Sequence, residues 1–244
     1  MPLPITQSPH SSLTAGPSYH KLPRILFAAC ILLGPLVVLL GFVFDPDFGV
    51  PHGANGIFNA YQNASALRIQ LFLWFNAVTP FFFPLSYLGL ALLATRRAPV
   101  LATLGAAFGL LGSLPWGLFV PMEALAGVMV QRGDSAAFAQ LWNSISAQGV
   151  ITFLQLSWVI GHLLGYVLLG VALGRARALP LWAVCLIVAG VPFQMIAYPT
   201  QQGIFQILGF ALVFLGSIPA ALALVRRPDG AAALPARAES TAAS

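Results

Sequence analysis

Long apolar runs constrain this chain more than any other feature, because about 20 apolar residues in a helix cross the roughly 30 Å hydrocarbon core of a bilayer. Such runs occur at about residues 25–44, 67–94, 100–120, 150–173, 181–198 and 204–225. In lipid, backbone amides and carbonyls must be hydrogen-bonded within the protein, so an apolar segment crosses as a helix. The sequence therefore predicts an all-α fold, a polytopic transmembrane helix bundle with six spans.

The composition excludes an ordinary soluble domain. Of 244 residues, 59% are hydrophobic and only 7% are charged, whereas a soluble domain carries about 25% charged residues. The net charge of +5 comes from short basic clusters between the apolar runs. No contiguous basic face results, so nucleic acid is not expected as a partner. The lipid bilayer is the expected environment, and we expect a multi-pass protein of a bacterial plasma (cytoplasmic) membrane.

The basic residues also predict an orientation. Of the 11 lysines and arginines, all except Arg68 and Arg132 lie in the chain ends or in the turns at 96–97 and 175–177. These segments share one side of the membrane if the chain crosses six times. Since cytoplasmic segments are enriched in Lys and Arg, the bundle is predicted to be N-in/C-in.

Segments outside the runs fall into two kinds. Residues 1–24 and 226–244 are rich in Pro, Ser and Ala and have no apolar period, so we expect disordered cytoplasmic tails flanking the 25–225 membrane domain. The external loops, at 45–66 and 121–149, are longer than the cytoplasmic turns.

The second external loop contains an amphipathic pattern. Phe138, Leu141, Trp142 and Ile145 recur at the spacing of one helix face, and Asp134 or Ser135 is suited to cap the start of that helix. The helix is predicted either to lie on the outer leaflet or to pack over the mouth of the bundle.

Small residues predict where the spans touch, because close packing of small residues drives helix association in lipid. The third span carries one glycine stripe, and the fourth carries two pairs. The stripe is Gly105, Gly109 and Gly112, and the pairs are Gly161 with Gly165 and Gly170 with Gly174. We expect these stripes to meet within one chain, with pairing between chains as the alternative.

Polar side chains inside the spans gather toward the external side. The candidate cluster is Asn76, Glu123, Gln155, His162, Gln194 and Gln206, with Asp45 and Asp47 as rim acids. Polar groups in a membrane face protein or water and often mark function. The cluster is therefore either the lining of an outward-facing pocket or a set of interhelical hydrogen bonds. His162 alone is either a neutral histidine satisfied by a neighbouring helix or a proton relay or ligand.

Most membrane-enzyme signatures are missing from the sequence. The four histidines are too scattered to form a metal site, so no metal and no cofactor are expected. One enzyme hypothesis remains, a small membrane-embedded terpene cyclase, because aromatic faces stabilise cations and a desolvated acid can donate a proton. The aromatic residues considered for it are Phe72, Trp74, Phe75, Phe81, Phe82 and Phe83, all in the second span.

One segment carries a family resemblance. Gly165-Tyr166 begins a stretch that runs through Arg175-Ala-Arg177-Ala-Leu-Pro180-Leu-Trp182 to Ala189-Gly190. A helix ends in a basic turn, and Pro and Trp open the next span. In this pattern the central part of the chain resembles a broad family of small bacterial six-helix membrane proteins known only as a domain of unknown function. The resemblance implies the six-helix fold and no reaction.

The function predicted from the sequence is binding by the outward-facing cluster, and catalysis is the less favoured interpretation. A small hydrophobic ligand, a lipid or a membrane protein partner is the expected occupant. A transporter or transporter subunit and the terpene cyclase are the alternatives.

Overall fold

The computed structural model describes residues 21–48 and 53–226, and these ranges are helical with no strand. Their helices are α1 (Lys21–Phe44), α2 (Ala54–Asn63), α3 (Ala66–Ala94), α4 (Pro99–Ser113), α5 (Trp116–Arg132), α6 (Ser135–Ser146), α7 (Gly149–Ala176), α8 (Leu181–Thr200) and α9 (Gly203–Val225). The predicted tails lie outside the described residues, apart from positions 21–24, which open α1, and Arg226, which caps the end of α9.

Six segments of the described ranges are long and apolar enough to cross a membrane. They are α1, α3, the pair α4–α5, α7, α8 and α9, while α2 and α6 are short. This confirms the predicted all-α bundle of six membrane-length segments. Its orientation in the membrane stays a prediction.

The third segment differs from the continuous span predicted at 100–120. It breaks after Ser113 and continues as α5 to Arg132, so that the two helices together cover Pro99–Arg132. The break falls at Leu114-Pro115, where proline lacks an amide donor and its ring clashes with the preceding turn. Residues 121–132, assigned to the second external loop from sequence, are therefore helical.

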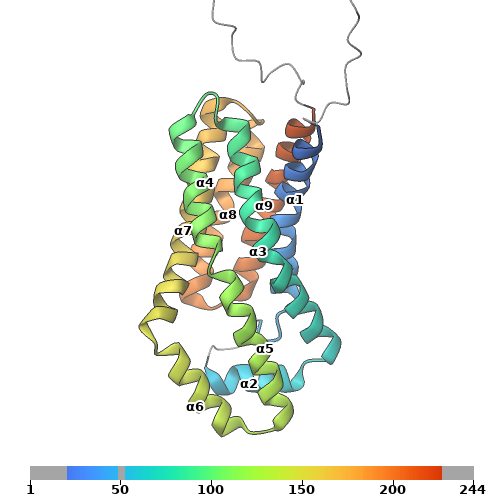
Figure 1. Cartoon of the computed structure of the whole chain (residues 1–244), viewed down its shortest axis with the longest axis vertical. Helices are drawn as coiled ribbons and strands as arrows, with labels where there is room; N and C mark the ends of the chain where they lie inside the picture. Colours follow the sequence, from blue (N-terminus) through green and yellow to red (C-terminus); the bar gives the residue numbers. More distant parts are fainter. Residues whose placement is uncertain (1–20, 49–52, 227–244) are drawn as a thin grey trace, which may run out of the picture.

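The bundle has two unlike ends (Figure 1). The start of α1, the end of α9 and the two short arginine-bearing turns meet at one end, and α2 and α6 close the other. At the first end, Arg97 donates a hydrogen bond from Nη1 to the carbonyl oxygen of Ala176 at 3.0 Å. A cation at the C-terminus of α7 also stabilises the helix dipole. This arginine therefore ties the α3–α4 turn to the α7–α8 turn.

The glycine stripes meet within the chain. A Cβ added at Gly161 would lie 2.5 Å from Gly112 Cα, and one added at Gly165 would lie 2.7 Å from Gly109 Cα. Such approaches exclude any side chain at the crossing of α4 and α7. Gly170 and Gly174 instead face Val188 and Val184 of α8. The glycines of both spans therefore make close helix contacts within one chain, the arrangement that we expected from the sequence.

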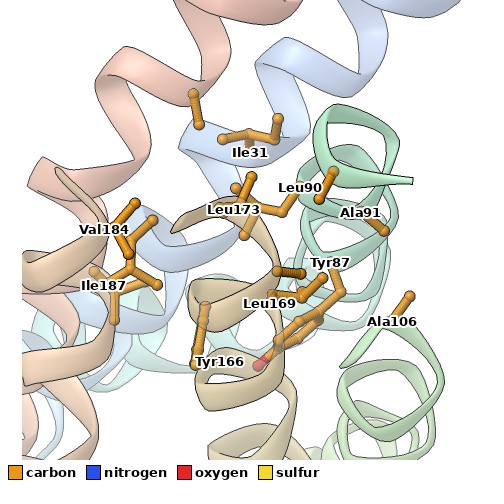
Figure 2. Close-up of a cluster of buried hydrophobic side chains, with 14 of the residues drawn as sticks. Ile31, Tyr87, Leu90, Ala91, Ala106, Tyr166, Leu169, Leu173, Val184 and Ile187 are labelled. Atoms are coloured by element: carbon orange, nitrogen blue, oxygen red, sulfur yellow. The ribbon is translucent and has the colours of Figure 1, made fainter. Parts of the chain in front are cut away.

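Around this crossing lies a continuous apolar core (Figure 2). Tyr87 of α3 and Tyr166 of α7 are fully buried, and their ring centroids are 4.9 Å apart. Leu169, Leu173 and Ile187 extend the core toward the arginine-bearing end. Most polar side chains that the sequence singled out lie beyond this core, toward α2 and α6.

Candidate functional site

A cavity of about 350 Å³ opens among the helices at the α2–α6 end of the bundle. Its polar lining includes six of the eight residues proposed from the sequence: Asp45, Asp47, Asn76, Glu123, Gln155 and Gln206. These residues come from α3, α5, α7, α9 and the segment after α1. The fold thus brings together side chains that are up to 161 positions apart (206 − 45). The remaining two candidates, His162 and Gln194, are buried and do not line the cavity.

Three acids face the cavity, and two of them follow α1 directly. The Asp47 amide donates to Asp45 Oδ1 at 3.1 Å. Burial raises the pKa of Asp45 well above its usual range, and the neighbouring Asp47 and then the charge of Glu123 raise it further. Among the described residues that line the cavity there is no Lys, Arg or His. The described part of the lining is therefore acidic.

Arg68 lies beside this acidic group and donates hydrogen bonds to two backbone carbonyl oxygens. Its Nε donates to the Phe44 carbonyl oxygen at 3.3 Å, and its Nη2 donates to the Asp45 carbonyl oxygen at 2.5 Å. These are carbonyls at the C-terminal end of α1, where a cation complements the helix dipole. Arg68 thereby fixes the segment that presents both rim aspartates.

Glu123 is held by a residue that the sequence analysis did not single out. The Tyr61 hydroxyl donates to Glu123 Oε2 at 2.6 Å, a short bond of the kind expected for a charged acceptor. Tyr61 lies on α2 and is only 2% exposed. Burial, followed by the charge of Glu123, raises the pKa of Tyr61, so its hydroxyl remains a donor. The short helix α2 thus positions the carboxylate of α5.

Aromatic rings make up much of the remaining lining. They come from α1, α3, α5, α6, α7, α8 and the segment after α1, and are Phe42, Phe48, Phe72, Trp116, Phe119, Trp142, Trp158 and Tyr198. Of the second-span aromatic residues considered for a cyclase, only Phe72 is among them. Trp74 and Phe81 are instead 67% and 69% exposed on the outside of the bundle. The aromatic wall therefore comes from several helices, and Phe72 is the aromatic residue that α3 contributes to it.

The amphipathic helix predicted to start at Asp134 or Ser135 is α6, and it forms part of this site. Asp134 accepts a hydrogen bond from the Ala137 amide at 2.9 Å and so caps α6. Phe138 is buried against Phe58 of α2 and stacks with Trp142, which lines the cavity. These contacts favour the packing of α6 over the bundle mouth rather than on the outer leaflet.

His162 lies one layer below the cavity, behind Trp158. The two rings stack with centroids 4.0 Å apart. His162 Nδ1 is 2.5 Å from the Trp158 carbonyl oxygen, so it carries a proton, and Nε2 is 2.8 Å from Gln194 Oε1. A neutral ring then accepts at Nε2, and Gln194 Nε2 has no partner among the described residues, so we assign the amide group with its nitrogen toward the ring. This pairing ties α7 to α8 and favours the satisfied-histidine interpretation.

Two buried polar atoms in the cavity wall have no hydrogen-bond partner among the described residues. They are Gln206 Oε1 and Trp116 Nε1, and both side chains are less than 10% exposed, at 7% and 8%. Buried polar atoms are nearly always hydrogen-bonded. An acceptor and a donor in this wall are thus available to an occupant.

No protein-family model matches the chain, and neither the curated proteins nor the solved structures contain a significant match. The resemblance to a six-helix family therefore stays a prediction, and the function is inferred from the site itself.

Proposed function

We propose that this integral membrane protein binds a small organic ammonium ion in the cavity beneath α2 and α6. The observation that carries the proposal is the lining, which combines three acids with eight aromatic rings. Aromatic faces attract organic cations through the ring quadrupole, with about 0.5–2 kcal/mol per contact. The volume of about 350 Å³ is within the roughly 300–1,000 Å³ typical of small-molecule sites.

Acidic residues explain why the occupant is cationic rather than neutral. A cleft lined by charges of one sign concentrates the opposite charge. Burial raises the pKa of Asp45 most, and the repulsion from Asp47 and Glu123 adds to it, so a cation near these acids offsets that repulsion. Gln206 Oε1 offers an additional acceptor to an ammonium ion that carries N–H groups.

Tetramethylammonium is the simplest probe of this proposal. We expect saturable binding to the full-length protein in nanodiscs, with a dissociation constant below about 1 mM, or about −4 kcal/mol. Tryptophan fluorescence is a suitable readout because three of the 5 tryptophans, Trp116, Trp142 and Trp158, line the cavity. Sodium chloride at equal ionic strength is the control. A response that does not saturate, or that sodium reproduces, would refute the proposal.

The affinity for tetramethylammonium is expected to rise with pH. Its charge is permanent, so only the protein titrates. Because the pKa of Asp45 is raised well above its ordinary value of 3.8, protons compete with the cation at pH values above the usual aspartate range. Binding should therefore be weakest below that range and strengthen as pH rises through the raised pKa. In Asp45→Asn the pH dependence should flatten, and an unchanged pH profile would show that Asp45 does not face the ligand.

We place the cavity on the external side of the membrane, since the arginine-bearing turns then face the cytoplasm. Topology reporters inserted at 96–98 and at 132–136 are expected to report opposite sides, with the first inside. The same side for both insertions would contradict a six-span arrangement.

A terpene cyclase is the second candidate, and a specific observation favours it. Aromatic walls stabilise carbocations, and an aspartic acid with a raised pKa, as at Asp45, is suited to donate a proton. Purified protein incubated with an uncharged prenyl substrate should then form a cyclic product, and Asp45→Asn should form none. Binding of tetramethylammonium without any product would leave the ammonium-binding function alone.

A further inference from the structure

Four arginines gather at the end of the bundle opposite the cavity. Arg96 and Arg97 lie in the turn between α3 and α4, and Arg175 and Arg177 lie where α7 ends and the chain turns toward α8. All four residues are exposed. The hydrogen bond from Arg97 Nη1 to the Ala176 carbonyl oxygen, at 3.0 Å, holds the two turns together. Figure 1 shows both turns at the same end of the bundle.

This positive charge has no described carboxylate beside it. The acids of the described residues all belong to the end formed by α2 and α6, and they are Asp45, Asp47, Glu123 and Asp134. Like charges that a fold holds together repel one another and destabilise the compact state. An anion bound at the two turns would offset this repulsion.

The backbone of Arg177 is in a conformation that favours glycine. This residue caps α7 with φ 49° and ψ 37°, in the left-handed region. A residue with a Cβ is strained there, and glycine is the usual choice at such a helix end. Among the described residues that are not glycine, only Gln201 shares a positive φ, and Gln201 lines the cavity. Retained strain of this kind points to a function for the arginine side chain.

Apolar side chains lie beside the arginines on the outer surface of the bundle. Leu181 and Trp182 open α8 directly after Pro180, and they are 74% and 57% exposed. Val100, at the start of α4, is 68% exposed. An exposed tryptophan at the end of a span belongs to the aromatic belt at the membrane–water interface. The arginines therefore lie at the level of lipid headgroups, with apolar surface for acyl chains next to them.

We propose that the two arginine-bearing turns bind an anionic phospholipid. Its phosphate accepts hydrogen bonds from the arginines, because a guanidinium group matches a phosphate with two parallel N–H donors. Its acyl chains lie against Leu181 and Trp182. Basic clusters next to a membrane span attract anionic headgroups, whereas the ammonium group of a zwitterionic headgroup adds positive charge. This site is separate from the cavity and independent of the ammonium-binding function.

Native mass spectrometry of the full-length protein tests the lipid preference. Delipidated protein in detergent is titrated with phosphatidylglycerol and, separately, with phosphatidylcholine. We expect phosphatidylglycerol to bind at least about fivefold more tightly, the effect of about one basic residue near an anionic surface. Equal affinities for the two lipids would overturn the proposal. Soluble glycerol 3-phosphate, at the concentration of the lipid, should not displace phosphatidylglycerol, because it lacks acyl chains. Displacement would show a site for free phosphate esters and would overturn the assignment to a lipid.

Arg177→Gly separates lipid binding from a structural role. Arginines at these turns also complement the helix dipoles, so a purely structural role predicts a less stable variant with unchanged lipid affinity. We expect the reverse. The affinity for phosphatidylglycerol should fall about fivefold, while the unfolding midpoint in phosphatidylcholine nanodiscs stays the same or rises, because glycine relieves the strained backbone. Unchanged lipid affinity would overturn the proposal.

Two further variants show whether the position of the charge matters. Arg96→Gln, on the other turn, is expected to lower the affinity for phosphatidylglycerol by a similar factor. Arg132→Gln is the matched control, because it removes an exposed arginine from the last turn of α5 at the opposite end of the bundle. Its lipid affinity should not change. An equal loss in Arg132→Gln would mean that overall charge, and not this pair of turns, attracts the lipid.

Discussion

Glu123→Gln is expected to weaken tetramethylammonium binding about tenfold, which corresponds to roughly 1.4 kcal/mol. The substitution removes a negative charge from the cavity wall and preserves the size of the side chain. Its amide oxygen still accepts the hydrogen bond from the Tyr61 hydroxyl, which lies 2.6 Å from Glu123 Oε2 in the unsubstituted protein. The expected loss is therefore electrostatic. A fluorescence titration of the variant in nanodiscs measures it.

Asp134→Asn is the matched control for this prediction. Asp134 is an exposed acid outside the cavity lining, and asparagine replaces it well as the cap of α6. We expect an unchanged affinity in this variant. Equal losses in both variants would mean that overall charge, and not the cavity, attracts the cation.

Gly161→Ala is expected to lower the stability of the bundle by about 1–3 kcal/mol, the range usual for an overpacked core. The added methyl group would lie 2.5 Å from Gly112 Cα and 2.9 Å from the Phe108 carbonyl oxygen. Both are backbone atoms, so the clash can be relieved only if α4 and α7 move apart. The shift would also displace Trp158 and so reduce ligand binding. The midpoint of unfolding by sodium dodecyl sulfate, followed by circular dichroism, measures the loss.

Gly174→Ala on the same helix is the control for the glycine crossing. The nearest neighbour of its added Cβ is Val184 Cγ1 at 3.6 Å, an ordinary van der Waals distance. Alanine also has a higher helix propensity than glycine, so the unfolding midpoint should stay the same or rise. A Gly161→Ala variant as stable as Gly174→Ala would contradict the close contact of α4 and α7.

The fold was largely predictable because lipid leaves a sequence few options. A segment such as Ile204–Val225 is too apolar for water and too long for a soluble core strand, so it must be a spanning helix. The break at Pro115 was not predicted. Proline is tolerated inside α3 at Pro80 and Pro84, which that helix passes without interruption. The sequence around a proline does not reveal whether neighbouring helices support the interrupted backbone.

The polar residues of the site were predictable from their positions along the membrane spans alone. Polar residues toward the same end of several spans are expected to face one another or the cavity between them, because lipid does not solvate them. The arrangement of these residues was not predictable, since it depends on helix rotation. Thus His162 and Gln194 pair with each other below the cavity at 2.8 Å, while Gln155 lines it.

The aromatic part was missed although the sequence contains a usable pattern. Trp116, Phe119 and Glu123 on α5 follow the spacing i, i+3, i+7, and so do Gln155, Trp158 and His162 on α7. Residues with this spacing share a helix face. The local density of aromatic residues instead points to the phenylalanines of α3. Trp74 and Phe81 face outward because a dense aromatic run surrounds the whole helix.

Thiol labelling inside the cavity tests the central claim that this cavity is open and selects cations. Gln155→Cys supplies the thiol, in a protein that also carries Cys30→Ala and Cys185→Ser. Two methanethiosulfonate reagents of similar size are compared, one with a trimethylammonium group and one with a sulfonate group, each normalised to a free thiol. Ser144→Cys on the exposed part of α6 is the reference site.

The cationic reagent should react faster than the anionic one at Gln155→Cys, by at least about tenfold relative to Ser144→Cys, as expected for a cleft lined by one sign of charge. Equal rate ratios at the two positions would contradict the account, because the acids would then not govern what reaches the cavity.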